Sequence, residues 1–182
     1  YNPATDTWTA ISNTNAPAAR TEFDAVWTGT EMIVWGGYND NWDVLGDGGR
    51  YNPATDTWTP LSSANAPAAR AEHSAIWTGS AMIIWGGEDD NDALNSGASY
   101  DPVADAWTSL FTLNAPEARF YHFAVWSGNE MIVWSGYNSY GWLLSSGGRY
   151  DPAHDSWTAT REHDKPTPWY GETSVWTGEE MI

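Results

Sequence analysis

The sequence predicts an all-β fold built from repeated four-stranded antiparallel units. Three observations carry this prediction. The segment YNPATDTW begins at Tyr1, recurs unchanged at Tyr51 and returns in related form at Tyr100 and Tyr150, in steps of 50, 49 and 50 residues. Short apolar runs, several of them alternating, lie between clusters of Gly, Asn, Asp and Pro, which is typical of strands joined by turns. Apolar residues nowhere recur at helical spacing over a window of about ten positions.

The strands of one unit can be assigned in order from residue 21 onward. Alternation over 22–27 predicts the first strand, a turn follows, and the apolar run at 32–35 predicts the second. A loop rich in Asn, Asp and Gly leads to a short third strand at 50–51, and a Pro-containing turn leads to the fourth at 57–59. By the same pattern we expect units at 21–61, 71–110 and 120–160, the third and fourth strands of another unit at 1–11, and the first two strands of a further unit at 170–182.

The tryptophans follow the same repeat. Of the 14 in the chain, eleven fall into three columns: Trp8, Trp58, Trp107 and Trp157; Trp27, Trp77, Trp126 and Trp176; Trp35, Trp85 and Trp134. Each buried tryptophan removes about 150–250 Å² from water. We therefore expect all eleven to form the core. Trp42, Trp142 and Trp169 lie outside the columns and are candidates for ligand contact.

These features resemble those of kelch-repeat β-propellers over the whole chain. The period is close to 50 residues, a glycine doublet follows the second strand at Gly36-Gly37 and Gly86-Gly87, and Tyr51 is followed seven residues later by Trp58. The third doublet departs from the pattern as Ser135-Gly136. The resemblance implies kelch-type blades of four antiparallel strands that stack around an axis.

The number of blades is left open by the sequence. Kelch-like propellers usually have six or seven blades, whereas three full units and two partial ones can be counted here. The chain is either a piece of a larger ring or a four-bladed unit with incomplete closure, and two chains could also join through open edges. Oligomeric state is not fixed by the sequence.

Composition excludes several classes of function. Seven basic residues against 24 acidic ones give a net charge of −17, which argues against nucleic acid and anionic membranes as partners. No apolar run approaches the roughly 18 residues of a membrane span, so we expect no membrane insertion. The absence of cysteine excludes disulfides, thiolate metal sites and the Cys–Tyr cofactor of kelch-like copper oxidases. It does not fix the compartment, although an extracellular or periplasmic location is favoured.

A candidate ligand site lies at the start of the inner strands. Three of the seven cations end a repeated PAAR or PEAR segment: Arg20, Arg70 and Arg119. Radial symmetry would gather them at the mouth of the central channel, with Trp169 in the fourth place, where the resemblance implies a ligand pocket in which arginines grip carboxylates. Alternatively, each arginine pairs with a nearby acid such as Glu22 or Glu72 and satisfies loop carbonyls.

The positions that follow the arginines differ from unit to unit. We include in the candidate site Glu22, Glu72 and Tyr121 on one face of the inner strands and His73 and His122 on the other. Aromatic, carboxylate and guanidinium groups together suit sugars and peptide side chains. We predict no metal and no cofactor, because Phe23 occupies the third place in the histidine column. Trp42 and Trp142 complete the candidate set, and Ca²⁺ binding by the acidic loops stays open.

These observations favour a non-catalytic recognition propeller that binds a protein or glycan at the mouth. No nucleophile elbow, zinc-binding helix or phosphate-binding glycine loop is present, so we assign no catalytic residue. Two alternatives remain. One is a kelch-type sugar epimerase or mutarotase that uses a channel carboxylate such as Glu22 or Glu72. The other is a structural propeller fragment that assembles through its open edges. The identity of the ligand is not determined by the sequence.

Overall fold

The computed structural model describes residues 1–161, 163–168 and 173–182. Within these residues twelve strands form three sheets of four strands each, and within each sheet the strands that are consecutive along the chain pair antiparallel. No helix of the length and hydropathy needed to cross a lipid bilayer occurs in this part of the chain. The prediction of an all-β fold made of four-stranded antiparallel units is confirmed.

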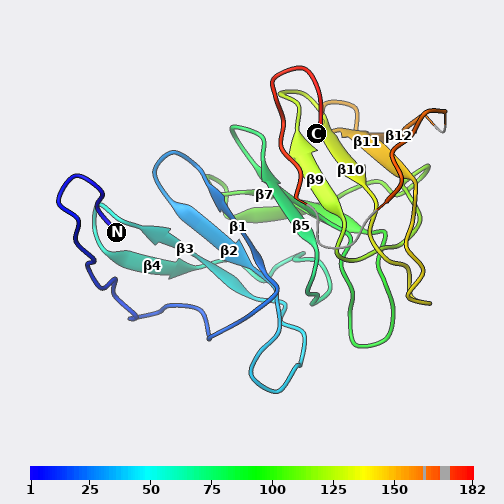
Figure 1. Cartoon of the computed structure of the whole chain (residues 1–182). Coiled ribbons are helices and arrows are strands. Elements are labelled where there is room, and N and C mark those ends of the chain that lie inside the picture. Colours follow the sequence, from blue (N-terminus) through cyan, green and yellow to red (C-terminus); the bar gives the residue numbers. More distant parts are fainter. Residues whose placement is uncertain (162, 169–172) are drawn as a thin grey trace.

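The three sheets follow one another along the chain, from the blue and cyan strands to the orange strands in Figure 1. The first contains β1 (Asp24–Trp27), β2 (Met32–Trp35), β3 (Gly48–Asn52) and β4 (Thr57–Pro60). The second contains β5 (Ser74–Trp77), β6 (Met82–Trp85), β7 (Gly97–Asp101) and β8 (Ala106–Ser109). The third contains β9 (Phe123–Trp126), β10 (Met131–Trp134), β11 (Gly147–Asp151) and β12 (Ser156–Ala159).

A four-residue turn sets the register between the first two strands of each sheet. In the first sheet Gly29 has a φ of 100°, a conformation that suits glycine because it has no Cβ. The backbone N–H of Glu31 donates to Thr28 Oγ1 at 2.9 Å and so closes the turn. Ser127 Oγ accepts the corresponding bond in the third sheet. All three sheets therefore share one register between their first two strands.

One row of large side chains crosses each sheet. In the second sheet Trp77 pairs with Met82, Met82 with Tyr100, and Tyr100 with Trp107. The corresponding residues are Trp27, Met32, Tyr51 and Trp58 in the first sheet, and Trp126, Met131, Tyr150 and Trp157 in the third. Because cross-strand neighbours on one face pack together, each Trp–Met–Tyr–Trp row forms a continuous apolar surface.

The core lies between neighbouring sheets. The row of the second sheet packs against the facing side of the first, which contributes Val26, Ile33 and Trp35. The row of the third sheet packs against the facing side of the second, which contributes Ile76, Ile83 and Trp85. Each interface thus joins β-branched and tryptophan side chains of one sheet to the Trp–Met–Tyr–Trp row of the next.

The expectation that all eleven column tryptophans belong to the core is wrong at two positions. Four of the eleven are buried: Trp35, Trp85, Trp107 and Trp157. Trp8 and Trp27, however, are 84% and 53% exposed. Both lie at the N-terminal end of the stack, where no sheet formed by the described residues covers their side. A tryptophan at a repeat position is therefore buried only when a neighbouring sheet lies against it.

One aspartate in each unit ties that unit to the one before it. Asp105 Oδ1 accepts a hydrogen bond from the Tyr100 hydroxyl at 2.7 Å and another from the backbone N–H of Ser62 at 3.0 Å. Asp56 and Asp155 make the same pair of contacts in their units. Asp105 has a φ of 48°, in the left-handed region that Asp tolerates better than most residues. The YxPxxDxW motif thus encodes both a turn and a link between units.

Candidate functional site

The residues that precede the inner strands meet at one end of the stack. β1 contacts β5, and β5 contacts β9. Glu72 N donates to the Glu22 carbonyl at 2.9 Å, and Tyr121 N donates to the Glu72 carbonyl at 3.2 Å. These three residues have φ values of 50°, 56° and 50°, which are uncommon for residues other than glycine and mark constrained positions. The backbone therefore holds equivalent positions of three units side by side.

These positions border a cavity of about 180 Å³, which we call the mouth cavity. It is lined by Glu22, Phe23, Asp24, Glu72, His73, Tyr121 and His122. The structure thus brings together the two glutamates, the tyrosine and the two histidines that the sequence placed in the candidate site. Asp24 was not predicted, and its Oδ2 accepts the backbone N–H of Ala75 at 2.8 Å. The equivalent positions of the other two sheets hold Ser74 and Phe123, and the carboxylate at this position is the sequence signal that could have identified Asp24.

Glu72 has the most perturbed carboxyl group of the cavity. Burial, the largest cause, and the charges of Glu88 and Glu22 together raise its pKa to about 7, against the lowering effect of the hydrogen bond from Tyr121. Its Oε2 atom is buried and has no hydrogen-bond partner in the described structure. Near neutral pH, Glu72 is therefore close to half ionised, and one of its acceptor oxygens is unsatisfied.

The two histidines are buried and uncharged. Burial, the largest cause, together with the charge of Arg70 or Arg119, lowers the pKa of His73 and of His122, respectively, to about 3. His122 Nε2 and Ser74 Oγ are hydrogen-bonded at 2.8 Å. Neither ring nitrogen of His73 has a partner among the described residues. No described set of three or more His, Asp or Glu side chains is arranged to hold a metal ion.

The arginine column supports the loops around the mouth. Arg70 Nη1 donates to the carbonyls of Gly86 and Ser96 at 3.0 and 2.7 Å, and its Nη2 donates to Ser96 Oγ at 3.0 Å. Arg119 and Arg20 make corresponding contacts with their own loops. Arg70 and Arg119 are 1% and 0% exposed. Most of their donors are thus used within the chain, and ligand binding by these arginines stays a prediction.

The acid that pairs with an arginine of this column is not one of the expected glutamates. Arg20 Nη2 lies 3.0 Å from Asp47 Oδ1. Within the described residues, no ion pair links the column to Glu22 or Glu72. The alternative interpretation, that each arginine satisfies loop carbonyls, agrees with these contacts. The glutamates suggested as partners, Glu22 and Glu72, do not form these ion pairs within the described residues.

A second set of residues beside the mouth was not assigned to it from the sequence. The residue that follows each glycine doublet, or its Ser-Gly equivalent, forms a β-bridge with the residue after the arginine. Two of these residues, Tyr38 and Glu88, are hydrogen-bonded to each other, with the tyrosine hydroxyl as donor. Glu88 also raises the pKa of Glu72. Their fixed position after the doublet is the signal that could have identified them.

The remaining predicted contact residues lie outside the mouth cavity. Trp42 and Trp142 are 69% and 68% exposed. They lie on the loops that follow β2 and β10. Since the end of β2 pairs with the start of β1, and the end of β10 with the start of β9, these loops stand at the same end of the stack as the mouth. Trp169 is outside the described residues.

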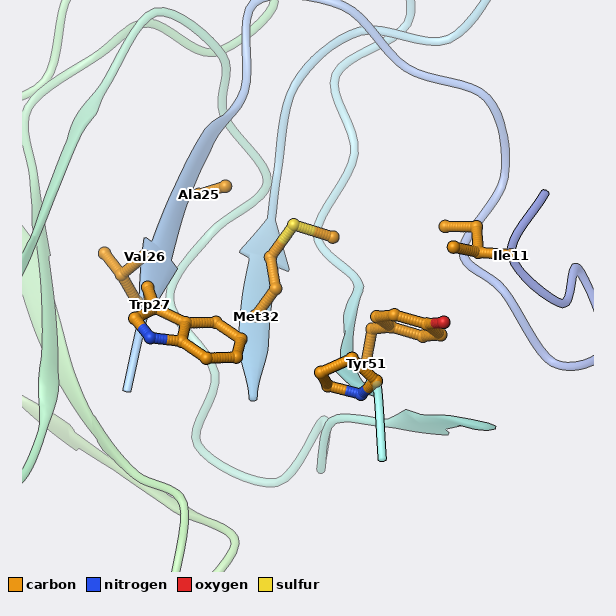
Figure 2. Close-up of a pocket in the computed structure, with 7 residues that line it drawn as sticks. Ile11, Ala25, Val26, Trp27, Met32 and Tyr51 are labelled. Carbon is orange, nitrogen blue, oxygen red and sulfur yellow. The ribbon is translucent and has the colours of Figure 1, made fainter. Parts of the chain in front are cut away.

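A different surface lies on the uncovered side of the first sheet. It is a depression of about 550 Å³ lined by Ile11, Ala25, Val26, Trp27, Met32, Tyr51 and Pro53. Figure 2 shows Trp27, Met32 and Tyr51, from three adjacent strands, with Ile11 of the N-terminal segment beside them. Most of the residues equivalent to this Trp–Met–Tyr–Trp row are buried in the second and third sheets. We call this surface the open row face.

Comparison with known proteins identifies a family. The family model described as the KLHDC2/KLHL20/DRC7 Kelch-repeats domain matches residues 1–182. The match covers the three sheets and the segments on both sides of them. Among curated proteins, none matches this sequence.

Proposed function

The chain belongs to the kelch-repeat family represented by the KLHDC2/KLHL20/DRC7 Kelch-repeats domain, and from this membership we propose that it binds a segment of another protein at the mouth cavity. Kelch domains generally bind proteins, and the kelch-repeat propeller fold supports a non-catalytic recognition role. The proposal adds the location of the site and the class of ligand.

The proposal is carried by one observation: side chains that differ from unit to unit meet at a single cavity. The rows that form the core repeat from sheet to sheet with little change. At the mouth, by contrast, equivalent positions hold Glu22, Glu72 and Tyr121, and all three line one cavity. Because the scaffold does not require these particular side chains, their arrangement is better explained by recognition than by stability.

The size of the cavity favours a protein segment over a small free ligand. Its volume of about 180 Å³ is below the roughly 300–1,000 Å³ of pockets that enclose drug-sized ligands. It suits the end of one inserted side chain, with the rest of the ligand lying on the surrounding loops. Trp42 and Trp142 provide exposed aromatic surface on those loops, of the kind that often dominates binding energy at protein interfaces.

The test uses a library of random peptides and a glycan array as probes. Peptides selected on the wild-type protein are measured against Tyr121→Ala and Glu22→Gln, both at the mouth. Val103→Ala is the matched control, because Val103 is 95% exposed and lies past the end of β7, away from the mouth. We expect the mouth variants to weaken binding by about tenfold or more, as is common for central contact residues, and the control to leave it unchanged. Equal binding by all three variants, or selection of glycans alone, would overturn the proposal.

A second candidate function is assembly of several copies through their open faces. Val26 and Ile33 cover the row of the second sheet. Their equivalents Val175 and Ile182, which are hydrogen-bonded to each other through their backbones, are 59% and 72% exposed, and Trp27 of the open row face is 53% exposed at the other end. The chain therefore carries both halves of an interface that it forms twice internally. Light scattering tests this candidate: concentration-dependent growth in mass that Trp27→Glu abolishes supports it, and a monomer at all concentrations contradicts it.

A further inference from the structure

We propose that the mouth cavity recognises a cationic side chain, the ammonium group of lysine or the guanidinium group of arginine, on the protein segment that it binds. This inference rests on the proposed function and names the chemical group that enters the cavity. Three kinds of observation support it: uncompensated carboxylates, unsatisfied acceptors, and the size and aromatic walls of the cavity.

The carboxylates of the mouth have no cationic partner within the described residues. Glu22, Asp24 and Glu72 line the cavity, and Glu88 lies close enough to raise the pKa of Glu72. All ion pairs among the described residues use other acids, namely Asp47, Glu31, Glu130, Asp151 and Asp164. The negative charge at the mouth is therefore available to a cation supplied from outside.

Two buried acceptor groups at the cavity have no donor among the described residues. Within that part of the chain, Glu72 Oε2 has no partner, and His73, which lines the cavity and is only 7% exposed, has none at either ring nitrogen. Because the buried His73 ring is uncharged, one of its nitrogens carries a lone pair that can accept a hydrogen bond. Buried acceptors without donors are costly. A lysine ammonium with three N–H groups or a guanidinium with five can supply what is missing.

The shape of the cavity suits an organic cation. A volume of about 180 Å³ is small for a whole ligand, and the described residues offer no metal-binding group. Phe23 and Tyr121 supply aromatic rings at the cavity wall, and aromatic rings attract cations held over their faces. Arg70, whose charge acts on His73, is buried and donates to Gly86 and Ser96. It therefore does not neutralise the cavity through an ion pair.

Binding should depend on pH through Glu72. The titratable or charged groups around it are Glu22, Asp24, Tyr38, Glu88, Arg70, His73, Tyr121 and His122. The two histidines titrate near pH 3 and burial raises the pKa of both tyrosines, so these groups keep one charge state between pH 6 and 8. With a Glu72 pKa of about 7, a cation that requires the ionised carboxylate binds about tenfold more tightly at pH 8 than at pH 6.

The experiment uses peptides with a fixed central residue. Two random libraries, one with central arginine and one with central lysine, are selected on the wild-type protein. Each selected peptide is resynthesised with citrulline or acetyl-lysine at the centre, and dissociation constants are measured at pH 6, 7 and 8. We expect the neutral replacements to weaken binding about tenfold or more. Glu72→Gln should lose a similar factor at pH 8 and abolish the pH dependence, whereas the exposed control Glu179→Gln should retain both. Glu22→Gln is the second mouth variant, in case Glu72→Gln is poorly folded.

The outcomes separate this inference from the proposed function. If peptides bind and Tyr121→Ala weakens them, but the neutral replacements and both glutamine variants bind as well as the originals, the cation inference is wrong and the proposed function stands. If neither library yields a peptide whose binding depends on Tyr121, but the unrestricted random library does, the cation inference is wrong and the proposed function stands. If the unrestricted library yields none either, the proposed function fails, and the inference fails with it.

Discussion

At the scale of single residues, two members of one tryptophan column show how burial depends on a neighbouring sheet. Trp107 and Trp8 occupy the same position of the repeat, yet they are 3% and 84% exposed. Trp107 packs in the core between the first and second sheets, and its Nε1 donates to the Ser62 carbonyl at 3.0 Å. The repeat pattern identifies the column, but the pattern cannot tell which of its members has a sheet beside it.

This difference makes a direct prediction about stability. Trp107→Ala should lower the free energy of unfolding by about 3–5 kcal/mol, because it removes a buried aromatic side chain and leaves a cavity. Trp8→Ala should change it by less than about 1 kcal/mol, as expected for an exposed position. Urea denaturation monitored by circular dichroism measures both. A large loss in Trp8→Ala would mean that its surface is covered in solution.

The candidate site could be predicted in part. Glu22, Glu72 and Tyr121 were identified because the repeat register fixes which residues begin the inner strands. The partners of the arginines could not be predicted in the same way. Arg70 reaches Gly86 and Ser96, which are 16 and 26 residues away, and the path of the intervening loop follows no periodic pattern. Long-range hydrogen bonds of irregular loops depend on packing rather than on local sequence preference.

At the scale of elements, the repeated aspartate joins the turn between the third and fourth strands of a sheet to the preceding unit. Asp105 accepts hydrogen bonds from Tyr100 and from the backbone of Ser62. Asp6 has the same place in the repeat and also a positive φ, and its Oδ1 accepts a hydrogen bond from Tyr1. The structure gives Asp6 no hydrogen bond from another unit among the described residues. A comparison of Asp6 with Asp105 therefore distinguishes the contribution of the turn from that of the link between units.

Alanine substitution at both positions tests the link. Asp105→Ala should cost about 2–4 kcal/mol, because it removes two hydrogen bonds of about 1 kcal/mol each and places alanine in a left-handed conformation. Asp6→Ala should cost less, about 1–2 kcal/mol, since it also places alanine in a left-handed conformation but removes no hydrogen bond to another unit. Asp105→Asn should lie between Asp105→Ala and wild type, because Asn tolerates the φ and can still accept. Chemical denaturation of the three variants gives the comparison, and equal losses at both positions would show that the link contributes nothing.

The strands themselves were well predicted because two local signals agreed. Alternation and turn residues placed the hairpin of β1 and β2, and the Thr-Gly turn fixes its register. The faces that lie open were not predictable from the same signals. The open row face carries the same residue types as its buried equivalents in the second and third sheets, so nothing in its composition marks it as exposed.

At the scale of the whole molecule, the described residues form a stack in which the first strands of neighbouring sheets contact each other, β1 with β5 and β5 with β9. The two core clusters share no residue, and both include residues of the second sheet. Stability in such an arrangement is close to a sum over units and the interfaces between them. The net charge of −17 opposes close approach of copies. Added salt should therefore strengthen any association through the open faces.

The second sheet packs between the first and the third, and this position also sets the order in which the sheets unfold locally. All four residues of β6 are buried, whereas β2 and β10 each keep partly exposed positions. Local unfolding begins where few apolar contacts must be broken, so it should start at the outer sheets and reach the middle one last. Amide hydrogens of β6 should therefore exchange with deuterium more slowly than those of β2 and β10. Uniform exchange rates across the three sheets would mean that the stack opens as one cooperative body.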